Sequence, residues 1–330
     1  MAGEQCKIWL GLQAAGVLIF FCVPLFGVGP YWLGVLNQIG LYALLALSLN
    51  IILGQAGMFH MGHAAFFAVG AYTTAILNTV YGWPIMATLP LAGLAAGFFA
   101  LVVAAPIIHL RGDYLLMVTI GIVEIVRIAL VNDIFGLTGG ANGIVSIKRP
   151  EIFGLRISKP DQFFYFIWGF TAVSILLFHW LENSRFGRAL NFIREDPVAA
   201  EGVGVNTTRY KLMAFVIGAV WAGFVGTIYA SQMRTISPGS FNFWESVVLF
   251  MIVILGGSGN QKGVLLGAFL VVGLPELFRG FQDSRLLFFG AALVLMMIFR
   301  PQGLLPPKGR NYHLPPEAAK LARAEKPETA

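Results

Sequence analysis

The sequence holds 330 residues, of which 57% are hydrophobic and only 12% are charged. Soluble domains usually carry about 25% charged residues, so the composition excludes an ordinary soluble fold and favours a polytopic, all-α membrane protein. The formal net charge of +6 is spread over short segments between apolar runs, a pattern that indicates membrane orientation rather than nucleic-acid binding. The two cysteines, Cys6 and Cys22, form neither a disulfide framework nor a zinc pattern.

Ten apolar segments approach the roughly 20 residues that a helix needs to cross a bilayer. The first is longer than the core of a signal peptide, about 7–15 residues, so we expect an uncleaved span. The eighth and ninth can form two full spans or one re-entrant pair. The ten segments are 8–28, 31–53, 61–77, 84–108, 114–131, 163–181, 212–232, 244–255, 263–275 and 286–299.

Lys and Arg residues predict how these spans are oriented. If both termini are cytoplasmic, the inside segments hold about twice as many Lys and Arg residues as the outside loops, as the positive-inside rule requires. Ten spans also divide into two sets of five with opposite orientation, the inverted-repeat arrangement of many transporters. That repeat stays a hypothesis because no strong internal match is visible. We assign 1–305 to a transmembrane domain and 306–330 to a mobile cytoplasmic tail.

The first glycine-rich stretch, GQAGMFHMGHAAFFAVGAY, covers 54–72 and interrupts the apolar pattern. Irregular backbone at membrane depth must be buried in protein or line a cavity, so the stretch predicts a translocation path or gate. Close helix packing through small residues is the alternative. Met58, Met61, His60 and His63 resemble a soft-metal site, but two imidazoles make an incomplete ligand shell. We favour a histidine packed at a helix break and predict no metal.

Glu124 and Arg127 lie three residues apart in IGIVEIVRIAL, which places them on one face of a helix. Ionisable groups at membrane depth are costly and usually face the protein interior or water. The pair fits a gating role and a purely structural ion pair equally well.

The segment 182–211, ENSRFGRALNFIREDPVAAEGVGVNTTRYK, is the longest predicted inside loop between spans. Asp196 and Pro197 suit the N-cap and the first turn of a short helix, which Gly202 or Gly204 would end. Such a helix on the inner face can dock a soluble partner. The alternative is a solvent-exposed loop that binds no partner.

A second glycine-rich stretch, GGSGNQKGVLLGA, begins at Gly256. Two interruptions of this kind in one chain favour a translocation path over packing alone. The residues that we assign to the path or gate are Gly54, Gln55, Gly57, His60, Gly62, His63, Gly70, Glu124, Arg127, Gly256, Gly257, Gly259 and Gly263.

Six segments, in preserved order, resemble the permeases of branched-chain amino acid ABC importers of the LivM type. They extend from Gly54 to Leu305 and read GQAGMFHMGHAAFFAVGAY, RGDYLLMVTIGIVEIVR, LTGGANGI, REDPVAAEGVGV, GGSGNQKGVLLGAFLV and RPQGLL. The chain departs from the family at His60, where a small Ser is usual, and at Lys262, where apolar or aromatic residues are common.

The resemblance implies a helical permease similar to the larger, type II-like ABC importers, which moves branched-chain or related small amino acids across the bacterial inner membrane. REDPVAAEGVGV looks like the EAA-type coupling loop, which docks in a groove of the ATPase subunit. On this resemblance we assign ATPase coupling to Arg194, Glu195, Asp196, Pro197, Ala199, Ala200, Glu201, Gly202 and Gly204. Among them, Glu201 and Arg194 are the expected contacts with the ATPase.

The same resemblance implies three kinds of partner: a second permease of the LivH type, two ATPase subunits and a soluble substrate-binding protein. The sequence contains no P-loop of the form GxxxxGK[ST]. We therefore expect a non-catalytic subunit without a cofactor of its own, with ATP and Mg²⁺ on the partner ATPases.

Two alternatives stay open. One is a permease of the same family for urea or short amides. The other is a stand-alone, ion-coupled secondary transporter, which needs intramembrane carboxylates or ion-binding backbone. Glu124 is the only clear carboxylate candidate, and Arg127 beside it disfavours a cation. A membrane-embedded enzyme is disfavoured because no span shows a nucleophile–base or paired-carboxylate pattern.

Overall fold

The computed structural model describes residues 21–27, 29–110, 112–152, 154–277, 290, 294, 298–300 and 303–306. Most of the predicted first span, 8–28, and most of the last, 286–299, lie outside the described residues, as does the predicted tail from 307 onward. The other eight predicted segments can be compared with the structure.

All eight of these segments are helical. In the described part of the chain, six helices are long and apolar enough to cross a membrane. They fall on the predicted segments that start at 31, 84, 114, 163, 212 and 244. The longer helices are α2 (Pro30–Asn50), α3 (His63–Thr79), α4 (Ile85–Ile107), α5 (Asp113–Val131), α6 (Pro160–Asn183), α7 (Arg185–Glu195), α9 (Thr207–Met233), α10 (Phe243–Gly256) and α11 (Gln261–Ala268).

The remaining elements are short. Two of them, η2 and η6, are π-helical turns that continue α2 and α11, and β1 and β2 form an antiparallel hairpin. They are η1 (Val23–Phe26), η2 (Ile51–Gln55), η3 (Ile134–Gly136), η4 (Gly140–Asn142), β1 (Glu151–Ile152), β2 (Leu155–Arg156), α8 (Pro197–Gly202), η5 (Pro238–Ser240), η6 (Phe269–Gly273) and α12 (Leu274–Leu277).

Two predicted segments differ from simple spans. Helix α3 has 17 residues and begins at His63, after the irregular segment 56–62, so it is shorter than the roughly 20 residues of a full span. The predicted segment 263–275 falls on α11, η6 and α12, which form one helical run from 261 to 277. The total of ten spans therefore stays a prediction.

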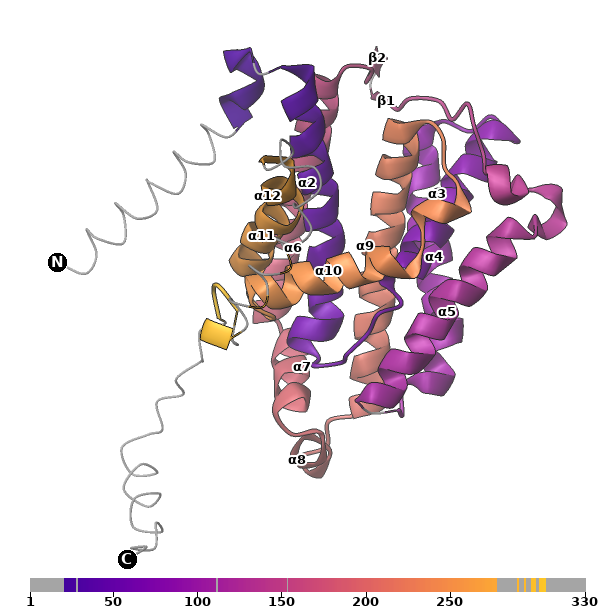
Figure 1. Ribbon diagram of the computed structural model, residues 1–330. Coiled ribbons are helices and arrows are strands. Elements are labelled where there is room, and N and C mark those ends of the chain that lie inside the picture. Colours follow the sequence, from indigo (N-terminus) through magenta and orange to yellow (C-terminus); the bar gives the residue numbers. More distant parts are fainter. Residues whose placement is uncertain are drawn as a thin grey trace, which may run out of the picture.

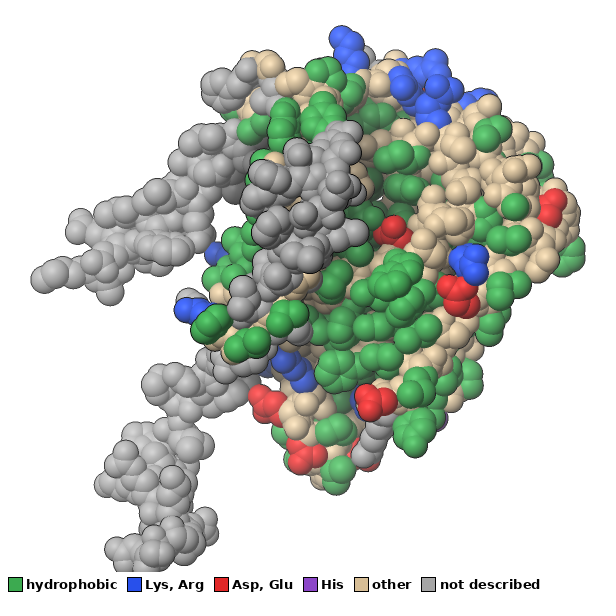
Figure 2. Space-filling view, viewed as in Figure 1, with side chains coloured by type: hydrophobic (Ala, Val, Ile, Leu, Met, Phe, Trp, Pro, Cys, Tyr) green, Lys and Arg blue, Asp and Glu red, His purple; other side chains and the backbone are tan. Residues whose placement is uncertain are grey.

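Helices α2, α4, α6 and α9 run between two ends of the molecule, which Figure 1 shows at top and bottom, and α10 lies across them. The hairpin end carries β1, β2 and the loop 132–159, and the coupling end carries α7 and α8. At the hairpin end, Ile144 and Ile236 form a β-bridge, and Asn78 Oδ1 accepts a hydrogen bond from Lys148 N at 2.8 Å. In Figure 2, Lys and Arg side chains gather at the hairpin end, and hydrophobic side chains cover the middle of the visible face.

Helix α9 packs closely against α3 and α4 through small residues. A Cβ at Gly70 of α3 would overlap the backbone of Gly223 in α9, and one at Gly223 would reach Ala92 O in α4. Thr74 and Thr227 exchange a buried hydrogen bond of 2.7 Å across the α3–α9 contact. Small residues and interhelical hydroxyl bonds are the usual means of close packing in membranes, so Gly70 lies in a packing contact.

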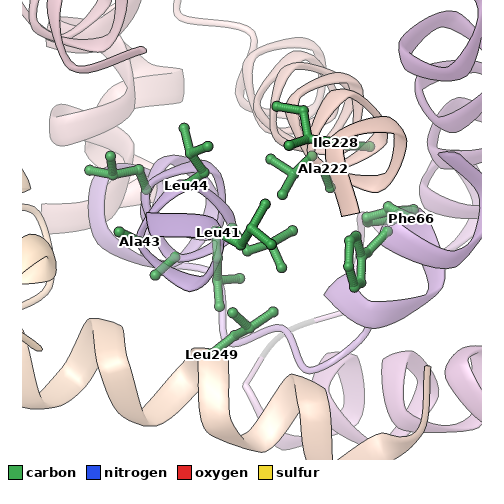
Figure 3. Packing of buried hydrophobic residues seen from close by; sticks show 14 of the residues in the cluster. Leu41, Ala43, Leu44, Phe66, Ala222, Ile228 and Leu249 are labelled. Atoms are coloured by element: carbon green, nitrogen blue, oxygen red, sulfur yellow. The ribbon is translucent and has the colours of Figure 1, made fainter. Parts of the chain in front are cut away.

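A hydrophobic core lies beside this contact, between α2, α9 and α10. Figure 3 shows Leu41 of α2, Leu249 of α10, and Ala222 and Ile228 of α9 converging on it, with Phe66 of α3 nearby. All five side chains are at most 3% exposed. Helix α10 contacts α2 at a steep angle, and this crossing brings its first turn beside the polar groups described below.

We predict that Gly70→Ala destabilises the protein, because the added methyl group overlaps backbone and overpacking typically costs about 1–3 kcal/mol. The midpoint of thermal unfolding in detergent should fall by several degrees. Gly169→Ala in α6 is the matched control, since a Cβ there meets no atom within 4 Å. Equal midpoints for the two variants would contradict the close α3–α9 contact.

Candidate translocation path and coupling element

The first helix break follows α2, which loosens into the π-turn η2 before the irregular segment 56–62 begins. Asn50 Oδ1 accepts a hydrogen bond of 2.8 Å from Gly259 N, 209 residues away. A Cβ at Gly54 would overlap both of those atoms. Gly54 therefore has to be a glycine for the two glycine-rich stretches to approach each other, and Asn50 joins them.

The N-terminus of α3 lies inside the bundle, where its first amide groups need protein partners. Met61 N donates to Thr119 Oγ1 of α5, and Ala64 N donates to Ser246 Oγ of α10, both at 3.1 Å. His63 Nε2 lies 2.7 Å from Ser48 Oγ of α2. Side chains from three other helices thus replace the water that would solvate this helix start at a protein surface.

His60 lies in an aromatic environment beside the same helix start. Its ring stacks on Phe66 with centroids 5.5 Å apart and meets Phe215 edge-on at 4.8 Å. The side chain is 1% exposed, and neither ring nitrogen has a hydrogen-bond partner in the described structure. The His60 and His63 centroids are 6.0 Å apart. No group of three or more His, Cys, Asp or Glu residues able to hold a metal ion occurs among the described residues.

The second break connects α10 to α11 through a tight turn. Gly257 has φ 111°, a conformation that favours glycine, and a Cβ at Gly256 would overlap the backbone of Gly263. Leu304 N donates to Leu255 O at 2.9 Å, and Leu305 N donates to Gly256 O at 3.1 Å. The segment 303–306 therefore supplies hydrogen bonds that the C-terminal carbonyls of α10 would otherwise lack.

The predicted short helix of the coupling loop is confirmed as α8. Asp196 Oδ1 accepts hydrogen bonds from Val198 N at 2.8 Å and Ala199 N at 3.1 Å, and Pro197 opens the helix. This is the cap that the Asp-Pro pair predicts. Val198 and Val203 are 65% and 70% exposed, so α8 presents apolar side chains at the coupling end.

Arg194, at the end of α7, connects the coupling loop to both helix breaks. Its Nη1 donates to Gly54 O. A Cβ at Gly57 would lie 2.8 Å from Arg194 Cγ, and one at Gly259 would lie 2.9 Å from Nη1. The side chain thus occupies space that Gly57 and Gly259 leave open, and its hydrogen bond to Gly54 ties α7 to η2.

Glu201 makes a second internal link. Its Oε1 accepts a hydrogen bond from Thr207 Oγ1, at the first residue of α9. Of the other residues assigned to coupling, Ala200 is buried and Pro197 is half-buried. The exposed ones are Glu195, Asp196, Ala199, Gly202 and Gly204. The element α7–α8 is therefore bound to the bundle on one side and open on the other.

Glu124 and Arg127 pair with each other on α5. Arg127 Nε and Nη2 both lie 2.8 Å from Glu124 Oε2, and each side chain is 36% exposed. The pair neutralises its own charge, which lowers the cost of its place in a span.

The structure therefore separates the predicted path residues into four groups. Gly54, Gln55, Gly57 and Gly259 lie at the junction of the two breaks, and His60, Gly62 and His63 lie at the start of α3. Gly256, Gly257 and Gly263 form the second break, whereas Gly70, Glu124 and Arg127 lie elsewhere in the bundle.

Sequence reasoning missed a polar pocket. It encloses about 180 Å³, and Tyr42 OH donates a 2.7 Å hydrogen bond to Glu245 Oε2 inside it. Glu245 is the second residue of the predicted segment 244–255. A carboxylate at that position is usual where a span meets the membrane surface, so the sequence did not single it out. Its neighbour Ser246 caps α3, which only the structure shows. The pocket is lined by Gln38, Leu41, Tyr42, Leu45, Phe67, Tyr229, Met233, Ser240 and Glu245.

Comparison with known proteins identifies one family over most of the chain. The family model described as branched-chain amino acid transport system / permease component matches residues 31–299. The chain is 41% identical over 289 residues to the high-affinity branched-chain amino acid transport system permease protein LivM of Salmonella typhimurium, covering 81% of this chain and 68% of that protein.

Two proteins of Escherichia coli are also similar. LivM, with the same description, is 40% identical over 307 residues, which cover 86% of this chain and 72% of that protein. The permease protein LivH of the same high-affinity system is 25% identical over 297 residues, which cover 80% and 91%. No solved structure matches the chain.

We predict that Asp196→Ala loosens α8, because loss of an N-cap costs about 1 kcal/mol, roughly a fivefold change in the local opening equilibrium. Hydrogen–deuterium exchange of the peptide 197–204 should accelerate accordingly. Asp196→Asn, which keeps an oxygen able to accept both amide hydrogen bonds, should exchange like the wild type. Wild-type exchange in the alanine variant would show that the cap does not hold α8.

Proposed function

The chain belongs to the family of branched-chain amino acid transport permeases, and we propose that it lines half of a path by which branched-chain or related small amino acids enter the cell. Membership makes it a non-catalytic, multi-pass membrane subunit of an ABC transporter. The structural observation that carries the mechanism is the Arg194–Gly54 hydrogen bond, because it connects an exposed helix pair to a helix break inside the bundle.

Two separate ATPase subunits, which hold ATP and Mg²⁺, supply the energy in this proposal. The full sequence has no P-loop, which supports placing nucleotide binding on other chains. Helix α8 is the docking element: its exposed Val198 and Val203 offer apolar contacts to a groove, and Glu195 and Asp196 offer charge.

Movement of α7–α8 reaches the bundle by two routes. Arg194 transmits it to η2 and to Gly259, and Glu201 transmits it to α9 through Thr207. Because η2 leads into the segment that ends at α3, a displacement there changes how α3 meets α5 and α10. The permease then alternates between a form whose path is open to the outside and a form whose path is open to the cytoplasm. The substrate shifts the equilibrium between these two forms only if it binds one more tightly than the other.

The remaining subunits are a second permease of the LivH type and a soluble substrate-binding protein. The similarity of this chain to both LivM and LivH supports a pair of related permeases. We place the complex in the bacterial inner membrane with the coupling end and both termini in the cytoplasm, in agreement with the bias of Lys and Arg. Two alternatives oppose this proposal: transport of urea or short amides, and transport driven by an ion gradient.

We predict that Glu201→Lys abolishes coupling. In proteoliposomes that hold both permeases and both ATPases, with binding protein outside, the wild type should take up labelled leucine only when ATP is inside. The variant should fall to roughly a tenth of that rate or less, because a lysine cannot accept the hydrogen bond from Thr207 Oγ1 that links α8 to α9, and loss of such a bond costs about 1–3 kcal/mol. Insertion into the membrane should be unchanged.

Glu151→Lys, an exposed reversal at the hairpin end, serves as the control and should transport normally. Normal uptake by Glu201→Lys would remove Glu201 from the coupling role. Wild-type uptake that follows an ion gradient without ATP, or uptake of urea in place of leucine, would refute the proposed function itself.

We predict that Val198→Cys reacts with a membrane-impermeant maleimide only from the cytoplasmic side, in a chain whose own two cysteines are replaced by serine. Val145→Cys, a similarly exposed position in the loop of the hairpin end, should react only from the periplasmic side. The comparison uses right-side-out and inverted vesicles. The reverse labelling pattern would place α8 where no ATPase can reach it.

A further inference from the structure

Glu245 is a half-buried carboxylate of α10 that the coupling mechanism does not use. It lies in the first turn of α10, within the run Pro238–Gly256, which is long and apolar enough to span a membrane. Among the described residues, no Lys or Arg forms an ion pair with Glu245, whose carboxylate is bound by Tyr42 OH. Charged groups at membrane depth without an ion-pair partner usually mark the route of a substrate or ion.

The pocket around Glu245 has two kinds of wall. Tyr42 holds the carboxylate through its 2.7 Å hydrogen bond, and Gln38, Tyr229 and Ser240 add neutral polar groups. The apolar lining consists of Leu41, Leu45, Phe67 and Met233. At about 180 Å³ the pocket is smaller than the roughly 300–1,000 Å³ that drug-sized ligands occupy. It suits a small molecule with one cationic group and an apolar side chain.

We propose that Glu245 forms a subsite for the α-ammonium group of the amino acid in transit, with the apolar wall contacting the side chain of that amino acid. The proposal rests on the proposed function and adds the residue that recognises the substrate inside the membrane. An ammonium group donates charge-assisted hydrogen bonds to a carboxylate, which are stronger than bonds between neutral groups. A metal ion fits less well, because it needs several ligands and this pocket offers one carboxylate.

The position of the subsite connects recognition to the path. Ser246, the next residue of α10, bonds Ala64 N at the start of α3, and Tyr42 lies on α2, which ends at the first break. Helix α10 itself ends at the second break. A substrate bound to Glu245 therefore contacts elements that lead to both breaks, so that movement of either break changes the pocket.

The first experiment measures leucine uptake by Glu245→Gln in the same proteoliposomes, per mole of assembled complex. Loss of a charged hydrogen-bond acceptor should reduce uptake at least about tenfold, and Glu245→Asp should recover part of it. Glu151→Gln, exposed at the hairpin end, should match the wild type. Wild-type uptake and KM in Glu245→Gln would overturn the subsite.

The second experiment tests the ammonium group directly and does not depend on transport. Ser240→Cys, in a chain whose own two cysteines are replaced by serine, is modified by a methanethiosulfonate reagent in the assembled complex. Leucine and 3-methylbutylamine should slow the reaction when Glu245 is present, whereas 4-methylpentanoate, which lacks the ammonium group, should not. Glu245→Gln should abolish protection by both amines.

The outcomes separate the two proposals. Equal protection by 4-methylpentanoate, or protection by leucine that survives Glu245→Gln, would overturn the ammonium subsite while leaving the permease function intact. Protection by Na⁺ alone would identify a cation site instead and would overturn the subsite as well. Absence of ATP-dependent leucine uptake by the wild type would refute the proposed function, whatever the protection pattern.

Discussion

The need to satisfy backbone hydrogen bonds away from water governs the arrangement of this molecule. Helix α3 starts inside the bundle, and α2 and α10 both end at irregular turns, so amide and carbonyl groups occur where lipid offers no partner. Thr119, Ser246 and the backbone of Leu304 and Leu305 supply the missing bonds. These bonds come from different parts of the chain, so each break is tied to the segments that supply its hydrogen bonds. Movement of a break therefore requires those segments to move or the bonds to break.

The junction of the two breaks explains why the glycines cluster there. Gly54, Gly57 and Gly259 leave room for Asn50 and for Arg194, whose side chains carry the contacts between segments far apart in the sequence. Packing of this kind has few alternative arrangements, because a displaced guanidinium would leave Gly54 O without its partner. In the proposed mechanism, these contacts transmit a displacement of α7 to the helix breaks.

Local chemistry predicted much of the fold. Apolar length located six helices that the structure describes, and the Asp196–Pro197 pair located α8 with its cap. The late start of α3 and the contacts of Arg194 could not be predicted, because both depend on partners distant in the sequence. Arg194 Nη1 binds Gly54 O, 140 residues away, and Ala64 N binds Ser246 Oγ, 182 residues away. Glu245 was overlooked because a carboxylate near the end of an apolar run is normal at a membrane surface. In the structure it is half-buried and lines a pocket with residues of α2, α3 and α9. Glu124, the carboxylate that the sequence favoured, has its own counter-ion.

The bonds between 304–305 and the end of α10 also constrain the order of assembly. Leu255 and Gly256 receive these partners from residues about fifty positions later in the chain, which at about 5–20 residues per second take several seconds to be synthesised. During that interval the C-terminal carbonyls of α10 lack these two donors. The glycine-rich turn therefore reaches its final hydrogen bonding only after residue 305 has been synthesised.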